Sequence, residues 1–179
     1  MNVSDQLTDL LRRRVLVLDG SMGALLFGHG LQEDDYRGER FADHPSSLKN
    51  NHDILNLTRP SVIAGIHSAY LDAGADIIET NTFNASSISQ AEFGAERHVR
   101  EINLAAAEIA CGCAEAAARI DPARPRFVAG SMGPLNKTQS ISVAADDPLK
   151  RAVTFDEVRD AYYEQAKALL DGGVDILLP

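Results

Sequence analysis

The sequence of 179 residues lacks tryptophan and has only two cysteines, Cys111 and Cys113. Two cysteines do not provide the disulfide framework typical of a small secreted domain. No apolar run approaches the ~20 residues that span a bilayer. The first fourteen residues place Leu7, Leu10 and Leu11 among charged residues, unlike a signal peptide. We therefore predict a cytoplasmic protein without a membrane partner.

Basic residues are also scarce: 17 Lys and Arg stand against 26 Asp and Glu, which gives a net charge of −9. Such a charge argues against sequence-independent binding to nucleic acid or to an anionic membrane. Apolar residues make up 45% of the chain and charged residues 24%, as in ordinary globular domains. The length favours one domain, over residues 1–179, with a sizeable core.

The most informative stretch is Gly74–Phe83. Its apolar part, Ala75–Ile78, predicts a buried strand, because buried parallel strands are apolar on both faces. The polar residues Glu79, Thr80 and Asn81 follow at the carboxyl end, where ligands bind in α/β folds. We predict that these three residues belong to a ligand site. Hydrogen bonding inside the fold is an equally supported alternative.

Three further strands are predicted on the same grounds, at Val15–Leu18, Phe127–Gly130 and Val174–Leu178. The first ends at Asp19-Gly20-Ser21-Met22-Gly23, which suits a tight turn with exposed backbone N–H groups. A plain turn with a capping aspartate is the equal alternative. The predicted strand Phe127–Gly130 is followed by Ser131-Met132-Gly133-Pro134, whose polar character is weaker.

Helical periodicity predicts helices over residues 4–14, 60–73, 98–120 and 155–171. Pro60 and Gly74 bound the second helix as expected, and Thr154 with Glu157 forms a capping box before the fourth. The predicted buried stripe of the third helix consists of Val99, Ile102, Ala106, Ile109, Cys113, Ala116 and Ile120.

Two polar segments, 28–59 and 136–152, have no clear periodicity, and a long loop in a compact domain is typically functional. The second holds Lys137, Thr138, Ser140 and Ser142 near a strand end.

No metal site is predicted from the histidines or cysteines. His44 and His52 lie in the first polar segment without metal-ligand spacing. Residues two apart on a helix point about 200° from each other, so Cys111 and Cys113 cannot face one ion.

An internal repeat relates residues 69–78 to residues 168–177, at an offset of 99 (69 to 168). Together with four strands that alternate with helices, it predicts an α/β fold with a parallel sheet and right-handed crossovers. Four units correspond to the first half of a (β/α)8 TIM barrel. A Rossmann-type fold is less favoured, because Asp19–Gly23 lacks the G-x-G-x-x-G spacing and no helix is predicted to start there.

Four segments carry a resemblance to a known family: Val17–Gly23, Arg37–Asp43, Gly74–Phe83 and Val128–Pro134. In this order they resemble the amino-terminal homocysteine-binding domain of cobalamin-dependent methionine synthases, within the homocysteine S-methyltransferase family. The chain resembles only the first half of that barrel. Arg37–Asp43 and Asn50–Asp53 point to the cobalamin-dependent branch.

The resemblance implies a methyltransferase of methionine biosynthesis. The complete enzyme moves a methyl group from methylcobalamin, recharged by 5-methyltetrahydrofolate, to the zinc-bound thiolate of homocysteine. Its folate, cobalamin and reactivation domains belong to the same polypeptide. Three cysteines on later strands hold the zinc, and Cys111 and Cys113 match none of them. This chain is therefore expected to supply no catalytic residue or metal ligand, to bind neither cofactor, and to be inactive alone.

The resemblance also implies substrate contacts. Asp19-Gly20-Ser21 corresponds to the turn that holds the homocysteine amino and carboxylate groups, although many relatives have glycine where Ser21 stands. Glu79, Thr80 and Asn81 correspond to positions at the barrel mouth, and Ser131 and Gly133 to a weaker set. Two alternatives stay open: a cobalamin-independent homocysteine methyltransferase that uses betaine or S-methylmethionine, and a non-catalytic amino-acid-binding barrel fragment.

Overall fold

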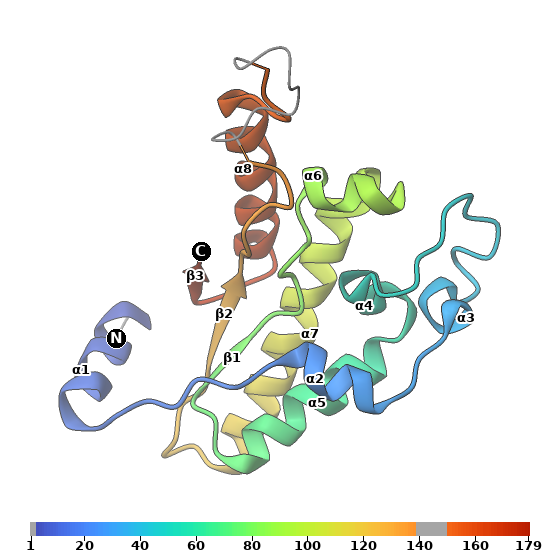
Figure 1. The fold of residues 1–179 in the computed structure, drawn as a ribbon. Helices are drawn as coiled ribbons and strands as arrows, with labels where there is room; N and C mark the ends of the chain where they lie inside the picture. Colours follow the sequence, from blue (N-terminus) through green and yellow to red (C-terminus); the bar gives the residue numbers. More distant parts are fainter. Residues whose placement is uncertain (1–2, 139–149) are drawn as a thin grey trace.

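The computed structural model describes residues 3–138 and 150–179 (Figure 1). Its sheet has three parallel strands in the order β1 (Ile77–Glu79), β2 (Phe127–Ser131) and β3 (Ile176–Leu178). Neighbouring strands are also consecutive in the sequence, so each connection must cross over, and helices supply the crossovers. The predicted parallel α/β arrangement is confirmed for these strands.

The predicted first strand is wrong in part. Residues 15–18 run parallel to β1, but only Leu18 forms a ladder bridge, with Ile77. The N–H of Val17 donates to the Asp76 carboxylate at 3.0 Å and not to a backbone carbonyl of β1. Val15 is 83% exposed and Val17 52% exposed, so none of the described elements packs over these two side chains. The segment is therefore an extended edge and not a full strand.

Three long helices follow the predictions closely. They are α5 (Pro60–Ala73), α7 (Val99–Ile120) and α8 (Phe155–Asp171), and α7 packs against both of the others (Figure 1). Gly74 ends α5 in the left-handed conformation, with φ 106°, which glycine adopts at low cost. Thr154 and Glu157 form the predicted capping box of α8. Buried side chains between these helices and the strands, such as Ile78, Val128 and Leu169, form one core cluster.

The buried face of α7 differs from the predicted stripe. Ile120 is 86% exposed and Cys113 only half-buried, whereas Ala107, Ala110 and Ala114 are buried. The cause is that α7 packs against both α5 and α8. A Cβ added to Gly172, just after α8, would lie 2.5 Å from the Cβ of Ala107. Such a close approach requires small residues and turns the alanine face inward.

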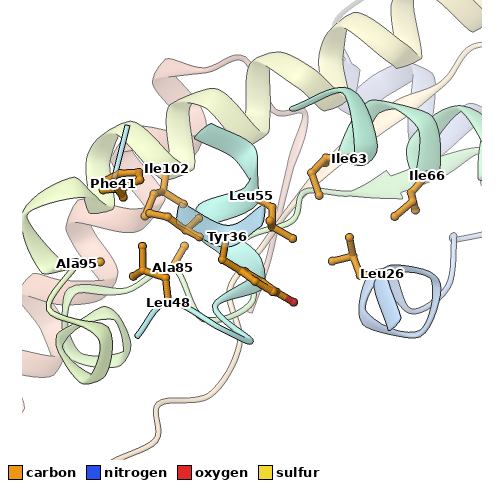
Figure 2. Close-up of a cluster of buried hydrophobic side chains, with 11 residues drawn as sticks. Leu26, Tyr36, Phe41, Leu48, Leu55, Ile63, Ile66, Ala85, Ala95 and Ile102 are labelled. Carbon is orange, nitrogen blue, oxygen red and sulfur yellow. The ribbon is translucent and has the colours of Figure 1, made fainter. Parts of the chain in front are cut away.

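The segment 28–59 is ordered and packed, which corrects the prediction of an irregular loop. It contains α3 (Glu33–Arg37), the 3-10 turn η1 (His52–Ile54) and α4 (Leu55–Thr58). Figure 2 shows Tyr36, Phe41 and Leu48 of this segment in a second core cluster with α5 and α7. This buried surface makes the segment a structural part of the domain and not a mobile flap.

An ion pair inside α3 organises the turns that follow it. The Arg37 guanidinium lies 2.6 Å from Glu33 and donates to the carbonyls of His44 and Ser46. Glu33 in turn accepts from the Ser47 hydroxyl and from the N–H groups of residues 48 and 49. These donors, led by Ser47, lower the pKa of Glu33 to about 2. The Arg37–Asp43 motif thus has a structural role here.

The remaining described helices are short or peripheral. After β1 come α6 (Ser87–Gln90) and the 3-10 turns η2 (Ala91–Phe93) and η3 (Glu96–His98). The amino-terminal helix α1 (Val3–Arg13) stands apart in Figure 1 and buries no residue. None of the described helices is long and apolar enough to cross a membrane. Of the second polar segment, Ser140 and Ser142 lie outside the described residues.

The internal repeat has a structural counterpart at the amino ends of two strands. Asp76, before β1, accepts the N–H of Val17 at 3.0 Å. Asp175, before β3, accepts the N–H of Val128 at 2.9 Å. Each aspartate therefore holds the neighbouring chain segment in register. The repeat encodes this contact in two places of the sheet.

Candidate substrate-binding pocket

A pocket of about 490 Å³ lies at the carboxyl end of β1. It is lined by Asp19, Gly20, Ser21, Met22, Gly23, His52, Asp53, Glu79, Thr80, Asn81, Thr82, Phe83, Asn84 and Ser131. The structure thus brings together every predicted site residue except Gly133. The sides come from the turn after residue 18, from η1, and from the exits of β1 and β2.

Asp19 is fixed at the base of this arrangement. Both of its carboxylate oxygens lie 3.1 Å from the N–H of Glu79, which donates to them. Partial burial, with a smaller contribution from the charge of Glu79, raises the pKa of Asp19 to about 7. Desolvation without a cationic partner has this effect on a carboxyl group. Asp19 can therefore respond strongly to a ligand that brings a positive charge.

A helix begins directly after this turn, which corrects the prediction that none starts there. Helix α2 (Met22–Gly28) is capped by Ser21, whose hydroxyl accepts the N–H of Ala24 at 3.2 Å. Leu26 of α2 packs into the second core cluster beside Ile63 and Ile66 (Figure 2). The anchored helix keeps the Asp19–Ser21 turn in place.

The polar residues after β1 divide into two kinds. Glu79 accepts the Ser131 hydroxyl at 2.9 Å and lines the pocket. Thr80 is buried, bonds to the Thr82 hydroxyl at 2.6 Å and accepts the Ser131 N–H at 3.0 Å. Asn81 donates to the carbonyl of His52 at 2.8 Å. Thr80 and Asn81 therefore hold the walls together, while Glu79 presents its charge to the pocket.

Gly133 lies beneath the pocket wall and not in it. Its N–H donates to the carbonyl of Phe83 at 3.1 Å. A Cβ at this position would lie 2.5 Å from that carbonyl oxygen and 2.8 Å from the Phe83 ring. Gly133 is therefore not among the residues that line this pocket. Its lack of a side chain lets Phe83, which is 56% exposed, sit at the pocket mouth.

Two residues of η1 were not predicted as site residues. Asp53 is buried, and its carboxylate accepts the N–H of Asn84 at 3.0 Å. Burial raises its pKa to about 7. His52 is half-buried and stacks on Tyr36, with ring centroids 6.1 Å apart. Burial lowers the pKa of His52.

A buried amide network holds η1 against the exit of β1. Asn56 donates to the carbonyl of Asp53 at 2.8 Å and to that of Asn81 at 2.7 Å. Asn51 and Gln90 exchange two side-chain hydrogen bonds, at 2.7 and 3.1 Å. Buried amides with satisfied partners fix a unique arrangement. Hence His52 and Asp53 are presented to the pocket by a rigid frame.

The two cysteines lie away from this pocket, on α7. The Cys111 thiol contacts the carbonyl of Gly173, and the Cys113 thiol contacts that of Ala64. Burial raises the pKa of Cys111 to about 11. Within residues 3–138 and 150–179, no three His, Cys, Asp or Glu side chains are placed to hold a metal ion. The described residues do not fit a zinc centre. The imidazole of His44, a histidine of the first polar segment, instead forms a hydrogen bond with the backbone carbonyl of Phe93 at 2.7 Å.

The parallel sheet and its crossover helices define a protein of the α/β class, with an acid-lined pocket at the strand ends. Within that class, the sequence matches the homocysteine S-methyltransferase family over residues 16–179, so the chain belongs to this family. The predicted family is confirmed.

Solved structures agree on the fold. The metallated form of the homocysteine methyltransferase MmuM from Escherichia coli is 22% identical, with a TM-score of 0.68 over 94% of this chain and 55% of that one. The oxidized form is 24% identical, with a TM-score of 0.68 and coverage of 94% and 53%. The apo form is 22% identical, with a TM-score of 0.61 and coverage of 94% and 50%. The chain spans about half the length of these relatives.

Proposed function

We propose that residues 1–179 form the amino-terminal half of the homocysteine-binding barrel of a cobalamin-dependent methionine synthase. The observation that carries this proposal is the acid-lined pocket at the strand ends, with Asp19 held by the N–H of Glu79. Family membership supports homocysteine as the substrate. The Arg37–Asp43 and Asn50–Asp53 segments support the cobalamin-dependent branch.

The charges of the pocket suit the amino group of an amino acid. Three carboxylates, Asp19, Asp53 and Glu79, line it, and none of its described lining residues is lysine or arginine. A buried carboxylate is stabilised when a cation approaches it. The homocysteine ammonium supplies such a cation. We assign its binding to Asp19, with Glu79 as the neighbouring charge and Gly20 and Ser21 as the supporting turn.

The role of this half is to bind and orient the substrate. When bound in the complete enzyme, methylcobalamin supplies the methyl group. The nucleophile is a thiolate, whereas a free thiol with a pKa of about 8.5 is mostly protonated at neutral pH. Neither Cys111 nor Cys113 faces the pocket, so the described residues offer no thiolate-activating metal ligands. Orientation by the Asp19 turn is therefore the contribution that we assign to this chain.

A methyl-donor assay tests the proposal. The full polypeptide encoded by the gene is incubated with homocysteine and one methyl donor at a time: methylcobalamin, S-methylmethionine or betaine. The methionine formed is then measured. We expect methionine from methylcobalamin. Methionine formed only from S-methylmethionine or betaine would contradict the cobalamin assignment.

The fold similarity to MmuM favours a second candidate, a cobalamin-independent homocysteine methyltransferase. In the assay above this enzyme would use S-methylmethionine or betaine. Homocysteine binding without transfer from any of the three donors would instead support a non-catalytic amino-acid-binding protein.

A further inference from the structure

Tyr70 of helix α5 contacts the Asp19–Ser21 turn from outside the pocket. Its hydroxyl donates to the backbone carbonyl of Ser21 at 3.1 Å. Its ring lies close to Gly20, where an added Cβ would be 3.0 Å from the hydroxyl oxygen and 3.3 Å from Cε1. Gly20 and Ser21 line the pocket, whereas Tyr70 does not. Tyr70 therefore supports the turn without a place for contact with a ligand.

The hydrogen bond from Tyr70 fixes the peptide that joins Ser21 to Met22. The described peptide bonds are all trans, and in a planar trans peptide the C=O and N–H groups point in opposite directions. Because the Ser21 carbonyl accepts from Tyr70, the N–H of Met22 points away from Tyr70. Met22 lines the pocket and is the first residue of α2, so its N–H has no acceptor within the helix. The Tyr70 hydroxyl thus helps to keep a backbone donor of the turn available.

Helix α2 needs such a support, because its own packing is slight. It has seven residues, of which only Leu26 is buried, and Phe27 is 89% exposed. A helix of this length is not stable without tertiary contacts. Leu26 anchors the part of α2 that lies away from the pocket. The hydrogen bond from Tyr70 anchors its first peptide, which is the part at the pocket.

Tyr70 is itself held in place by the core. The ring is half-buried and packs against both core clusters. Its helix α5 begins at Pro60 and is ended by Gly74, and it packs along α7. A side chain fixed between two clusters can hold a turn to within a narrow range of positions. The contact therefore transmits the rigidity of the core to the pocket.

We propose that Tyr70 is a positioning residue for the substrate: its hydroxyl holds the Ser21–Met22 peptide so that the turn is ready to receive the amino and carboxylate groups of homocysteine. This inference rests on the proposed function, since it takes homocysteine as the ligand. Tyr70 touches no substrate atom. It raises the affinity because the turn does not have to be ordered when the substrate binds.

The test is the affinity of the full polypeptide for L-homocysteine, measured by calorimetry on the wild type and on Tyr70→Phe. Phenylalanine keeps the ring between the two clusters and removes only the hydroxyl. Homocysteine should bind about two- to tenfold more weakly to the variant, which is the range that one neutral hydrogen bond contributes.

Tyr162→Phe is the matched control. The Tyr162 hydroxyl also donates to a backbone carbonyl, that of Gly133, at 3.0 Å, and neither residue lines the pocket. This substitution adds no atom near Phe83. Urea unfolding should show similar losses of stability in the two variants, whereas only Tyr70→Phe should lose homocysteine affinity.

A second measurement couples Tyr70 to the turn itself. In Gly20→Ala the new Cβ meets the Tyr70 hydroxyl oxygen at 3.0 Å, and in Tyr70→Phe that oxygen is gone. Gly20→Ala should therefore weaken homocysteine binding more in the wild type than in Tyr70→Phe. The double variant should lose less affinity than the product of the two single losses, as expected for residues in contact.

The other outcomes count against the inference. Unchanged homocysteine affinity in Tyr70→Phe would overturn it. Equal losses of affinity in Tyr70→Phe and Tyr162→Phe would show an effect of general stability and would also overturn it, as would single losses that simply multiply in the double variant. A wild type that does not bind homocysteine would refute the proposed function itself.

Discussion

At the residue scale, Asp19 combines a central position with an unusual protonation state. Its pKa of about 7 means that a substantial fraction is protonated in the free pocket at neutral pH. An ammonium close by would shift it to the carboxylate, because opposite charges favour the ionised form. Substrate binding and proton release at Asp19 are thus coupled. A substitution that removes only the charge of Asp19 therefore tests this coupling.

We expect Asp19→Asn to weaken homocysteine binding about ten- to a hundredfold, because a hydrogen bond to a charged group contributes about 1.5–3 kcal/mol. The amide oxygen of asparagine can still accept the N–H of Glu79, so the turn should persist. Titration calorimetry on the full polypeptide measures the affinity. Partial reactions that do not involve homocysteine should be spared. An unchanged affinity would remove Asp19 from the ammonium site.

Asp53 should make stability depend on pH. Because its pKa is raised from 3.8 to about 7, the folded state holds the proton more tightly than the unfolded state. The resulting stability is fully present below pH ~4 and is lost as pH rises through ~7. In Asp53→Asn this loss is absent, so from pH 5 to pH 8 the variant should gain up to ~3 kcal/mol of stability relative to the wild type, at about 1.4 kcal/mol for each pH unit between 5 and 7.

Urea unfolding of the full polypeptide at pH 5 and pH 8 measures this effect. Asp43→Asn is the matched control, because Asp43 is exposed. Parallel pH profiles for Asp53→Asn and the wild type would show that Asp53 does not titrate in this range. Asp19 has the same sign of shift, so a part of the wild-type slope should remain in the variant.

Sequence reasoning located Asp19 and Glu79 because strand ends are visible as apolar runs that break into polar residues. It did not locate His52 and Asp53. They reach the pocket only through contacts with Asn81 and Asn84, which lie 29 and 31 positions away. No local pattern reports such contacts. It also assigned Gly133 to the pocket, because a polar strand exit does not reveal which neighbour fills the space.

At the element scale, two glycines should respond in opposite ways to the same change. In Gly133→Ala the new Cβ would overlap the Phe83 carbonyl, which is backbone and cannot turn away. Overpacking of this kind costs about 1–3 kcal/mol. Gly112 lies exposed within α7, and an added Cβ meets nothing within 4 Å. Gly112→Ala should therefore stabilise the helix by about 0.5–1 kcal/mol.

Thermal unfolding of the full polypeptide compares the two glycine variants. A second readout is homocysteine affinity, which should fall in Gly133→Ala, because Phe83 at the pocket mouth must move, and stay constant in Gly112→Ala. Similar stability in both variants would mean that the β2 exit can relax away from Phe83.

The two repeat aspartates also differ in their surroundings. Asp76 is buried and pairs with Arg14 at 2.7 Å and Arg124 at 2.9 Å. These partners hold its pKa well below the usual range. Asp175 makes the same kind of backbone contact, but the residue as a whole is exposed. Partial burial of its carboxyl group raises its pKa.

We expect Asp76→Asn to cost on the order of 3 kcal/mol, because it leaves two arginines without their shared carboxylate. Asp175→Asn should change stability by only about 0.5 kcal/mol. Urea unfolding at pH 7 measures both. Below pH ~3 the difference between the costs of the two substitutions should become smaller. The ionised Asp76 contributes its stability above the pKa that it has in the unfolded state, and this stability is lost as the pH falls through its pKa in the folded state. Equal costs at pH 7 would contradict a role for the arginines.

Helices with strong end signals, such as those that begin at Pro60 and after Thr154, could be predicted almost to the residue. The segment 28–59 could not, because its order depends on Arg37 and Glu33 bonding to backbone groups up to sixteen positions away. Polar composition suggested a loop, whereas those polar groups are satisfied internally. The predicted strand at residues 15–18 is only partly formed, because β propensity does not reveal how many ladder hydrogen bonds a segment makes with its neighbour β1.

At the scale of the whole molecule, two core clusters share the burial. One lies between the sheet and α5, α7 and α8, and the other gathers α2–α4 around α5 and α7 (Figure 2). The pocket sits where the elements of the two clusters meet, between η1 and the exit of β1. The parallel order of the strands followed from the alternation of strands and helices in the sequence. The place where the two core clusters meet could not be predicted from the sequence, because it depends on packing between distant segments.

Both edges of the described sheet are open. On one side, Val15, Val17 and Leu18 are exposed, and on the other side Leu178 is exposed. An exposed apolar edge offers unpaired N–H and C=O groups to another chain, and closed barrels avoid this. We therefore expect the 179-residue chain, studied alone, to self-associate through these edges.

Sedimentation velocity at low micromolar concentration measures this association. Val17→Lys should reduce it, because a charged side chain on an edge opposes strand pairing. Ile120→Lys is the matched control: Ile120 is 86% exposed but lies at the end of a helix and not on a sheet edge, so its variant should associate like the wild type. If both variants dissociate equally, general surface hydrophobicity and not edge pairing drives the association. A wild-type monomer that unfolds cooperatively would show that the open edges are tolerated, and the edge-pairing prediction would be wrong.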